Sequence, residues 1–262
     1  MTLLDDHRLL VTGVLTDDSL AFAIARRALE EGAVVALSSF GRGMSLTRRT
    51  ARKLTEVGEV GEVIELDVTD PAQVSAAAAE LDERFGRLDG LVHAIGYAPP
   101  SCLGSGMFRA PFEDVATALH ASTYSLAALV GALRPLLARS SAPGGASVVA
   151  LDFDGSRAYP QYDWMGVAKA ALESLGRYLA REVGPDRVRV NMLAAGPLRS
   201  IAAKSIPGFS LFEDTWADRA PLGWDVNDTS VVGDAAVALL SPLLRATTGA
   251  ILHVDGGAHA MG

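Results

Sequence analysis

Cysteine is almost absent from this 262-residue sequence, which contains one, Cys102. A single cysteine cannot form an intramolecular disulfide or build a cysteine zinc cage, and the sequence predicts no metal site. No histidine and acidic residue can be identified as the partners that a nucleophilic thiol needs. We therefore expect Cys102 to be a partly buried thiol without a catalytic role.

Positive charge is also scarce. Lysine and arginine number 23 against 31 aspartates and glutamates, which gives a formal net charge of -8. A protein that binds nucleic acid normally presents a basic surface, so we expect no nucleic-acid partner. We expect the one basic cluster to be a solvated helix face; it comprises Arg48, Arg49, Arg52 and Lys53.

Long apolar runs and low-complexity stretches are missing as well. No apolar run reaches the roughly 18 residues that cross a bilayer, and "MTLLDDHRLL" is acidic where a signal peptide is basic. The expectation is a cytoplasmic protein without a membrane segment. Because 49% of the residues are hydrophobic and 21% are charged, the sequence favours a globular fold over disorder or a fibre.

Short apolar runs alternate with longer helical patterns along the chain. The predicted strands are residues 8–13, 33–39, 62–67, 88–96, 146–153, 187–197 and 250–257. The predicted helices include residues 19–31, 71–85, 112–139, 161–183 and 227–240. Strands separated by helices of this length predict a Rossmann-like, doubly wound α/β fold, with seven parallel strands and helices on both faces.

The chain shows no linker rich in proline, glycine or serine, so residues 1–262 are predicted to form a single dinucleotide-binding domain. Two segments, residues 97–111 and 198–225, interrupt the alternation after the carboxyl ends of strands. Ligands of open α/β sheets bind at that edge. These segments are therefore the expected substrate-covering loops.

The turn after the first strand reads "TGVLTDDSLAFAIA" (12–25). Gly13 can make a tight turn, and the helix that begins near Ser19 offers free N–H groups to a diphosphate. The G-x-G-x-x-G fingerprint is absent, because Ser19 and Ala21 stand where further glycines would be. An ordinary loop with Asp17, Asp18 or Ser19 capping the helix explains the same residues.

The second strand ends "LSSFGR", without the acidic residue that usually binds the ribose of NAD. Phe40 could stack on adenine, while Arg42 could meet a 2′-phosphate, so the residues alone leave NADH and NADPH open. Asp67 could accept a hydrogen bond from the adenine amino group, with Val68 against the ring. Asp67 could equally cap a turn before Pro71.

"YDWMGVAK" (162–169) places a tyrosine seven residues before a lysine. On a helix this spacing is close to two turns, so Tyr162 and Lys169 share a face roughly 10 Å apart, with Met165 between them. A lysine can hydrogen-bond the hydroxyls of a cofactor ribose. A tyrosine O–H can stabilise an oxyanion that forms on a carbonyl. Taken alone, the pair also fits an ordinary helix.

The glycine turn, Asp67, "HAIG", the Tyr162–Lys169 pair, "AAGP" and "VDGG" all follow strands at one predicted sheet edge. On these residues the whole chain resembles the short-chain dehydrogenase/reductase superfamily. The spacings G-x5-S-x-A and Tyr-x6-Lys are similar to those of the enoyl-acyl-carrier-protein reductases. Most other members place the tyrosine four residues before the lysine, where Met165 stands.

Three longer stretches resemble the mycobacterial-type, NADH-dependent branch of that family. They are "LDFDGSRAYPQYDWMGVAK" (151–169), "NMLAAGPLRS" (191–200) and "TTGAILHVDGGAH" (247–259). The resemblance implies NADH rather than NADPH as cofactor and an enoyl thioester on acyl carrier protein as substrate, in type II fatty acid biosynthesis. It also implies a homotetramer, for which apolar faces on helices 112–139 and 161–183 are suited.

The resemblance assigns roles to particular residues. Tyr162 would bind the thioester carbonyl, Lys169 the nicotinamide ribose and Met165 the substrate. Phe153, one position after Asp152, would pack beside nicotinamide and substrate, where the other bacterial branch has a tyrosine at the Asp152 position. The implied cofactor contacts are Gly13, Ser19, Leu20, Phe40, Asp67, Val68, Ile95, Gly96, Lys169, Leu198 and Ser200.

The sequence departs from the mycobacterial-type pattern between Ser200 and Trp224, where the substrate loop is shorter. A shorter loop covers less of an acyl chain, which implies short or medium chains as substrates.

Two other functions remain as alternatives. A carbonyl (3-ketoacyl or alcohol) reductase requires a tyrosine at the position of Met165. A catalytically idle NAD-binding sensor would not require the intact Tyr162 and Lys169.

Overall fold

The predicted strands form one parallel sheet in the computed structural model, which describes residues 2–104, 106–204 and 206–261. The strand order is β3-β2-β1-β4-β5-β6-β7. The strands are β1 Arg8–Thr12, β2 Val34–Ser39, β3 Ile64–Glu65, β4 Gly90–His93, β5 Ala146–Asp152, β6 Val188–Ala195 and β7 Ile251–Val254. The predicted α/β fold class is therefore confirmed.

The strand order reverses direction between β1 and β4. The chain begins at β1, proceeds outward to β3, then returns beside β1 and proceeds to β7 on the other side. Val11 of β1 pairs with Val92 of β4, so the turns that follow these two strands are neighbours. Such a switch point at the carboxyl ends of parallel strands is the usual ligand site of doubly wound sheets.

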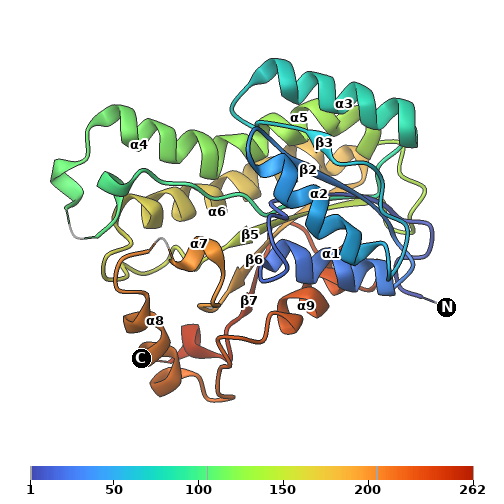
Figure 1. Cartoon of the computed structure of the whole chain (residues 1–262). Helices are drawn as coiled ribbons and strands as arrows, with labels where there is room; N and C mark the ends of the chain where they lie inside the picture. Colours follow the sequence, from blue (N-terminus) through green and yellow to red (C-terminus); the bar gives the residue numbers. More distant parts are fainter. Residues whose placement is uncertain (1, 105, 205, 262) are drawn as a thin grey trace.

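Helices cover both faces of the sheet (Figure 1). One face carries α1 Leu20–Glu30, α2 Gly43–Leu54 and α9 Ser230–Leu240, and the other carries α3 Pro71–Phe85, α5 Ser125–Leu137 and α6 Asp163–Val183. Side chains alternate along each strand, so Leu9 and Val11 of β1 enter one core and Leu10 enters the other. Each of these three leucine and valine side chains is fully buried.

The strands and helices begin or end a few residues from their predicted positions. In proportion to its length, the largest correction is the third strand, predicted over 62–67, because β3 retains only Ile64 and Glu65. This strand lies at the sheet edge and pairs on one side alone, with Val35 bonding to the chain at Glu59 and Gly61 just before it. The helix predicted from residue 161 begins at Asp163, with Tyr162 as its N-cap residue.

The helix predicted over 112–139 is divided by a π-helical turn. It consists of α4 Phe112–Leu119, the π turn His120–Tyr124 and then α5, which ends at Leu137. The π turn directs the hydroxyl of Thr123 to the carbonyl oxygen of Ala168 in α6, at 2.8 Å. π turns inside helices are frequent at functional sites, and this one contacts the helix that carries Lys169.

Within Phe112–Leu137, a window of 18 residues has a mean hydropathy of 1.3, which by length and composition is enough to cross a membrane. This window contradicts the expectation that no stretch of roughly 18 residues is apolar enough to do so. Half of the window is buried within the protein, where Leu126, Leu129 and Leu133 of α5 are in the core with residues of α3 and α6. It is packed as a core helix of this domain.

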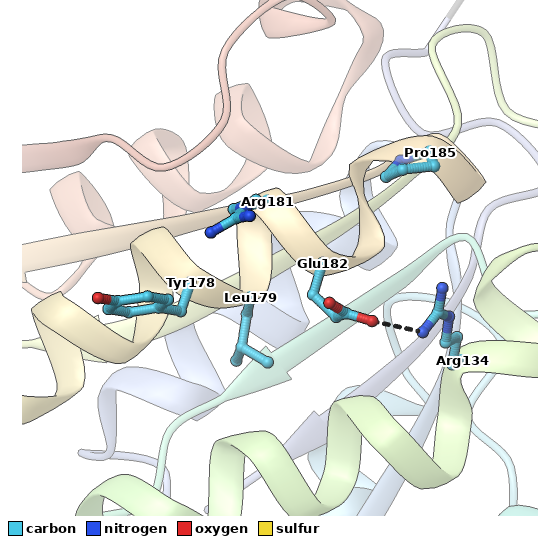
Figure 2. Close-up of a pocket in the computed structure, with 6 residues that line it drawn as sticks. All are labelled: Arg134, Tyr178, Leu179, Arg181, Glu182 and Pro185. Atoms are coloured by element: carbon cyan, nitrogen blue, oxygen red, sulfur yellow. Dashed lines mark hydrogen bonds and ion pairs between the residues drawn. The ribbon is translucent and has the colours of Figure 1, made fainter.

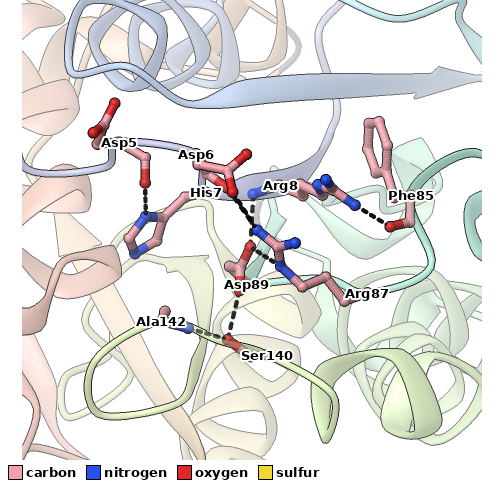
Figure 3. A network of polar contacts seen from close by, with 9 residues as sticks. All are labelled: Asp5, Asp6, His7, Arg8, Phe85, Arg87, Asp89, Ser140 and Ala142. Carbon is pink, nitrogen blue, oxygen red and sulfur yellow. Dashed lines mark hydrogen bonds and ion pairs between the residues drawn. The ribbon is translucent and has the colours of Figure 1, made fainter.

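A buried carboxylate ties together the amino-terminal edge of the sheet (Figure 3). Asp89, which immediately precedes β4, is 1% exposed. It accepts hydrogen bonds from the backbone N–H of Arg8 at 2.9 Å, the Nε of Arg87 at 3.2 Å and the hydroxyl of Ser140 at 2.6 Å. This network joins β1 to β4 and to the segment before β5, at the edge opposite the predicted site.

Replacing Asp89 by alanine should destabilise the fold by about 3–5 kcal/mol, because it leaves the N–H of Arg8 and the hydroxyl of Ser140 without their acceptor and removes the buried one of the two carboxylates that pair with Arg87. Urea unfolding at fixed protein concentration measures the change. The control is Asp6→Ala, since Asp6 also pairs with Arg87 but its side chain is 72% exposed. This exposed pair should contribute at most about 1 kcal/mol. Equal losses in both variants would contradict the assigned role of Asp89.

Candidate active site

The turn after β1 requires glycine. Gly13 has a φ of +83°, and an added Cβ would lie 2.0 Å from the carbonyl oxygen of Ala94, which follows β4. The turn therefore packs the ends of β1 and β4 against each other. The hydroxyl of Ser19 accepts a bond from the N–H of Phe22 at 3.2 Å and caps α1, as one of the two interpretations expected. The first N–H groups of α1, from Leu20, begin directly beyond this cap.

The ends of β2 and β3 carry the residues expected near adenine. Phe40 follows β2 and is 53% exposed, a position from which its ring can meet a planar ligand. The Oδ1 atom of Asp67 accepts bonds from the N–H of Thr69 at 2.9 Å and its hydroxyl at 2.7 Å. Asp67 therefore closes a turn, in agreement with the alternative interpretation, while Val68 is buried beside it.

Met165 fills the space between α6 and the end of β4. An added Cβ at Gly96 would lie 3.0 Å from the Cε atom of Met165, and the hydroxyl of Ser122 lies 3.6 Å from its sulfur. The hydroxyl of Ser122 also accepts the N–H of Tyr97 at 2.9 Å. The structure thus brings Met165 together with Gly96, and the π turn supports this contact through Ser122.

Lys169 is buried and attached to the end of β5. Its ammonium group donates a hydrogen bond to the carbonyl oxygen of Leu151 at 2.8 Å, and the residue is 6% exposed. Burial lowers the pKa of Lys169.

His93 of β4 is a buried neighbour of this site. Burial, together with the nearby charge of Lys169, lowers the pKa of His93 to about 3, so this histidine is neutral at physiological pH. The ring of His93 is hydrogen-bonded to Ser125 at 2.8 Å.

Tyr162 is 6% exposed at the start of α6. Its neighbours Gln161 and Asp163 both have positive φ, of 64° and 38°, which is strained for residues other than glycine. Burial, and then the negative charge of Asp152, raises the pKa of Tyr162. The phenol therefore keeps its proton at physiological pH and can donate a hydrogen bond.

Aromatic side chains cover Tyr162. The ring of Phe153 lies 5.2 Å from that of Tyr162, and 5.6 Å from the rings of both Phe212 and Trp216. Phe212 and Trp216 belong to α8 Phe209–Arg219, which follows α7 Ile201–Lys204 in the segment expected to cover the substrate. Figure 1 shows α8 apart from the helices that flank the sheet. α8 therefore forms an aromatic cover over this part of the site.

Gly196 permits the covering segment to rest on the sheet edge. An added Cβ there would lie 2.8 Å from atoms of both Trp216 and Trp224, and the indole N–H of Trp224 donates to the carbonyl oxygen of Pro197 at 2.7 Å. Leu198 is buried nearby, and the hydroxyl of Ser200 accepts the N–H of Ala203 at 3.2 Å. Gly196 and Pro197 of the "AAGP" stretch therefore contact Trp216 and Trp224 and support the aromatic cover.

The other expected loop, residues 97–111, is attached to the start of α6. The N–H of Gly104 donates to the carbonyl oxygen of Gln161 at 2.9 Å, and the indole of Trp164 donates to the carbonyl oxygen of Met107 at 2.9 Å. Its helical turns are η1 Pro100–Cys102 and η2 Met107–Arg109. Cys102 is fully buried in this loop, and burial raises the pKa of its thiol. A buried, protonated thiol is a poor nucleophile.

The sequence did not point to Phe212 or Trp216 individually. A signal was present for the cover, because two of the three tryptophans of the chain lie in residues 198–225. Within the part of the chain that the structure describes, no group of three or more histidine, cysteine, aspartate or glutamate side chains could hold a metal ion.

A separate hollow of about 670 Å³ lies along the carboxyl-terminal half of α6 (Figure 2). It is lined by Arg134, Tyr178, Leu179, Arg181, Glu182 and Pro185. Arg134 and Glu182 pair across it at 3.3 Å. None of the predicted site residues lines this hollow, so it is distinct from the site around Tyr162.

A glycine turn after β1, a switch point beside it, and buried tyrosine and lysine at the same edge are typical of a Rossmann-type dinucleotide-dependent reductase. The profile of the family described as enoyl-(acyl carrier protein) reductase matches residues 13–259. The chain belongs to this family.

Relatives of this chain carry the same family description. An enoyl-acyl-carrier-protein reductase (NADH) of Mycolicibacterium smegmatis is 43% identical, over 98% of this chain and 97% of the relative. One of Mycobacterium avium is 43% identical over the same shares. One of Synechocystis sp. is 36% identical, over 96% of both chains.

Replacing Gly196 by alanine should loosen the cover, because the added methyl group collides with Trp216 and Trp224. We expect a loss of about 1–3 kcal/mol in stability and stronger acrylamide quenching of tryptophan fluorescence. The control is Gly131→Ala in α5, where nothing lies within 4 Å of the added Cβ. Quenching that is unchanged in Gly196→Ala would show that the glycine does not hold the cover.

Proposed function

We propose that this protein reduces the trans-2 double bond of enoyl thioesters, carried on acyl carrier protein, with NADH in type II fatty acid biosynthesis. The observation that carries this proposal is the protonated, buried Tyr162 beside Phe153, with Met165 standing between Tyr162 and the anchored Lys169. Family membership and the NADH-dependent relatives support it. NADH supplies the hydride that the β-carbon of the substrate receives.

The residues at the sheet edge fit a dinucleotide. Gly13 lets the turn after β1 pass close to Ala94, and the capped start of α1 beyond this turn offers N–H groups and a helix dipole that favour a diphosphate. We assign cofactor contacts to Gly13, Ser19, Leu20, Phe40, Asp67, Val68, Ile95, Gly96, Lys169, Leu198 and Ser200. Lys169 holds the nicotinamide ribose by hydrogen bonds from its ammonium group.

Tyr162 stabilises the negative charge that develops on the substrate. When the β-carbon accepts a hydride, charge moves to the thioester carbonyl oxygen, and the phenol donates a hydrogen bond to that oxygen. Phe153 packs beside the reacting atoms, and Met165 contacts the substrate. The aromatic cover of Phe212 and Trp216 excludes water, which strengthens this hydrogen bond.

The proposed setting of the enzyme follows the same family. The chain acts in the cytoplasm as one domain of residues 1–262, and it assembles as a homotetramer. Exposed aromatic side chains at Tyr124 and Tyr178, beside α5 and on α6, support an interface along these helices. Sedimentation equilibrium tests the assembly, and a monomer at micromolar concentration would exclude it.

The closed aromatic cover supports short or medium acyl chains as substrates. Because Phe212 and Trp216 occupy space next to Tyr162, a very long chain must displace more side chains to bind. We expect kcat/KM to be higher with 2-octenoyl than with 2-octadecenoyl thioester. Steadily rising values up to the longer substrate would contradict this preference.

Replacing Tyr162 by phenylalanine should lower kcat about ten- to a thousand-fold, as expected from losing about 2–4 kcal/mol of oxyanion stabilisation. NADH binding, measured by fluorescence, should survive. Lys169→Ala provides the complementary test, because it should weaken NADH binding. If Tyr162→Phe lost NADH while Lys169→Ala retained it, the two roles would be assigned wrongly.

A further inference from the structure

Asp152, the last residue of β5, is a buried carboxylate without a well-formed hydrogen bond. It is 6% exposed, and within the described ranges its oxygens have only weak contacts, with the backbone N–H of Phe153 and the side chain of Glu173. The ammonium group of Lys169 is held nearby, because it donates to the carbonyl oxygen of Leu151, the residue before Asp152, at 2.8 Å. Other buried aspartates are fully paired: Asp89 has three donors, and Asp255 accepts the N–H groups of Gly257 and His259. A buried carboxylate without strong donors is costly, so its presence beside Lys169 calls for a function.

The groups around Asp152 come mainly from α6. Lys169 and Glu173, one helical turn apart, both act on its charge, and the charge of Asp152 acts in turn on Tyr162. On β4, the side chain of His93 is neutral, while the β6 residue paired with Asp152 is apolar Ala194. Lys169 is therefore the one cation that faces this carboxylate within the described residues.

The side chain of Glu173 is held in place on α6 by the chain that follows Asp152. Its Oε1 atom accepts the N–H of Gly155 at 2.6 Å, and the residue is 9% exposed. An added Cβ at Gly155 would lie 2.7 Å from the backbone of Ala170, so the chain after β5 lies flat on α6. This close packing fixes Glu173 relative to Asp152.

The charges of Asp152, Lys169 and Glu173 depend on one another. Burial raises the pKa of Asp152 to about 7; Lys169 acts in the opposite direction, and Glu173 raises it further. Burial lowers the pKa of Lys169, and the negative charge of Asp152 opposes that change. Above neutral pH, ionised Asp152 therefore helps Lys169 to keep its proton.

We propose that Asp152 is a positioning residue, which keeps Lys169 charged for the cofactor ribose, and that Glu173 sets the pH at which Asp152 begins to do so. The role in cofactor binding rests on the function proposed above for Lys169. Asp152 itself touches neither substrate nor cofactor in this account, because it acts through the lysine.

The first test is the pH dependence of NADH binding, measured by fluorescence from pH 6 to 9. Asp152→Asn mimics the protonated carboxyl, so it should match the wild type at pH 6. At pH 8.5 it should bind NADH about tenfold more weakly, because the pKa of Lys169 falls further when the negative charge of Asp152 is removed. The matched control is Asp154→Asn, which should follow the wild type, because Asp154 is hydrogen-bonded to Ser156 and Tyr159 instead.

A constant ratio of dissociation constants between Asp152→Asn and the wild type, whether unity or larger, would overturn the positioning role. A constant loss would mean that Asp152 is merely structural. If the wild-type protein bound no NADH at all, the proposed function would fail, and the second test would still decide on the coupling of the charges.

The second test uses the protein without cofactor. Because the folded-state pKa of Asp152 lies above its ordinary value of 3.8, the folded protein retains a proton that the unfolded chain releases. This residue therefore contributes less stability as the pH rises from about 4 to about 7, and the contribution is constant above that range. The difference in Tm between Asp152→Asn and the wild type, taken as variant minus wild type, should therefore increase as the pH rises from about 4 to about 7.

Glu173→Gln tests the part assigned to the second carboxylate. Its amide oxygen can still accept the N–H of Gly155, but the negative charge is gone. The pKa of Asp152 should then fall, and the stability of Glu173→Gln should level off at a lower pH than that of the wild type. An unchanged pH window would overturn the role of Glu173, and this variant decides the question even if Asp152→Asn fails to fold.

Discussion

The attachment of Lys169 to the end of β5 is the constraint on which the site depends. A buried ammonium needs acceptors, and the carbonyl oxygen of Leu151 provides one at 2.8 Å. This bond ties α6 to the end of β5. Met165 of the same helix then lies against Gly96 at the end of β4, and Tyr162, which caps the helix, lies beside Phe153 under the aromatic cover.

Met165 separates two kinds of chemistry within one fold. In the more common arrangement, a tyrosine at this position would donate to a carbonyl that itself receives the hydride. Here Met165 packs against Gly96, and the phenol of Tyr162 stands three residues earlier, almost one helical turn away. The proposed substrate therefore extends past Met165 and places a conjugated double bond, rather than its carbonyl carbon, at the reacting position.

Much of the fold could be predicted, because periodicity and turn residues act over short distances. The seven strands, most of the long helices between them and the glycine turn at Gly13 followed from such patterns, whereas no bounds were predicted for α2, α7 or α8. The π turn at His120–Tyr124 did not, because it depends on the contact of Thr123 with α6. In the same way, the isolation of Asp152 and the cover by Trp216 depend on residues distant in sequence, which periodicity does not report.

The displaced tyrosine makes this protein a reductase of double bonds rather than of carbonyl groups. The most direct test follows NADH oxidation with 2-octenoyl thioester and, separately, with 3-oxooctanoyl thioester of the same acyl carrier protein. We expect rapid, enzyme-dependent oxidation with the enoyl substrate and none above background with the oxo substrate. Oxidation with the oxo substrate alone would contradict it.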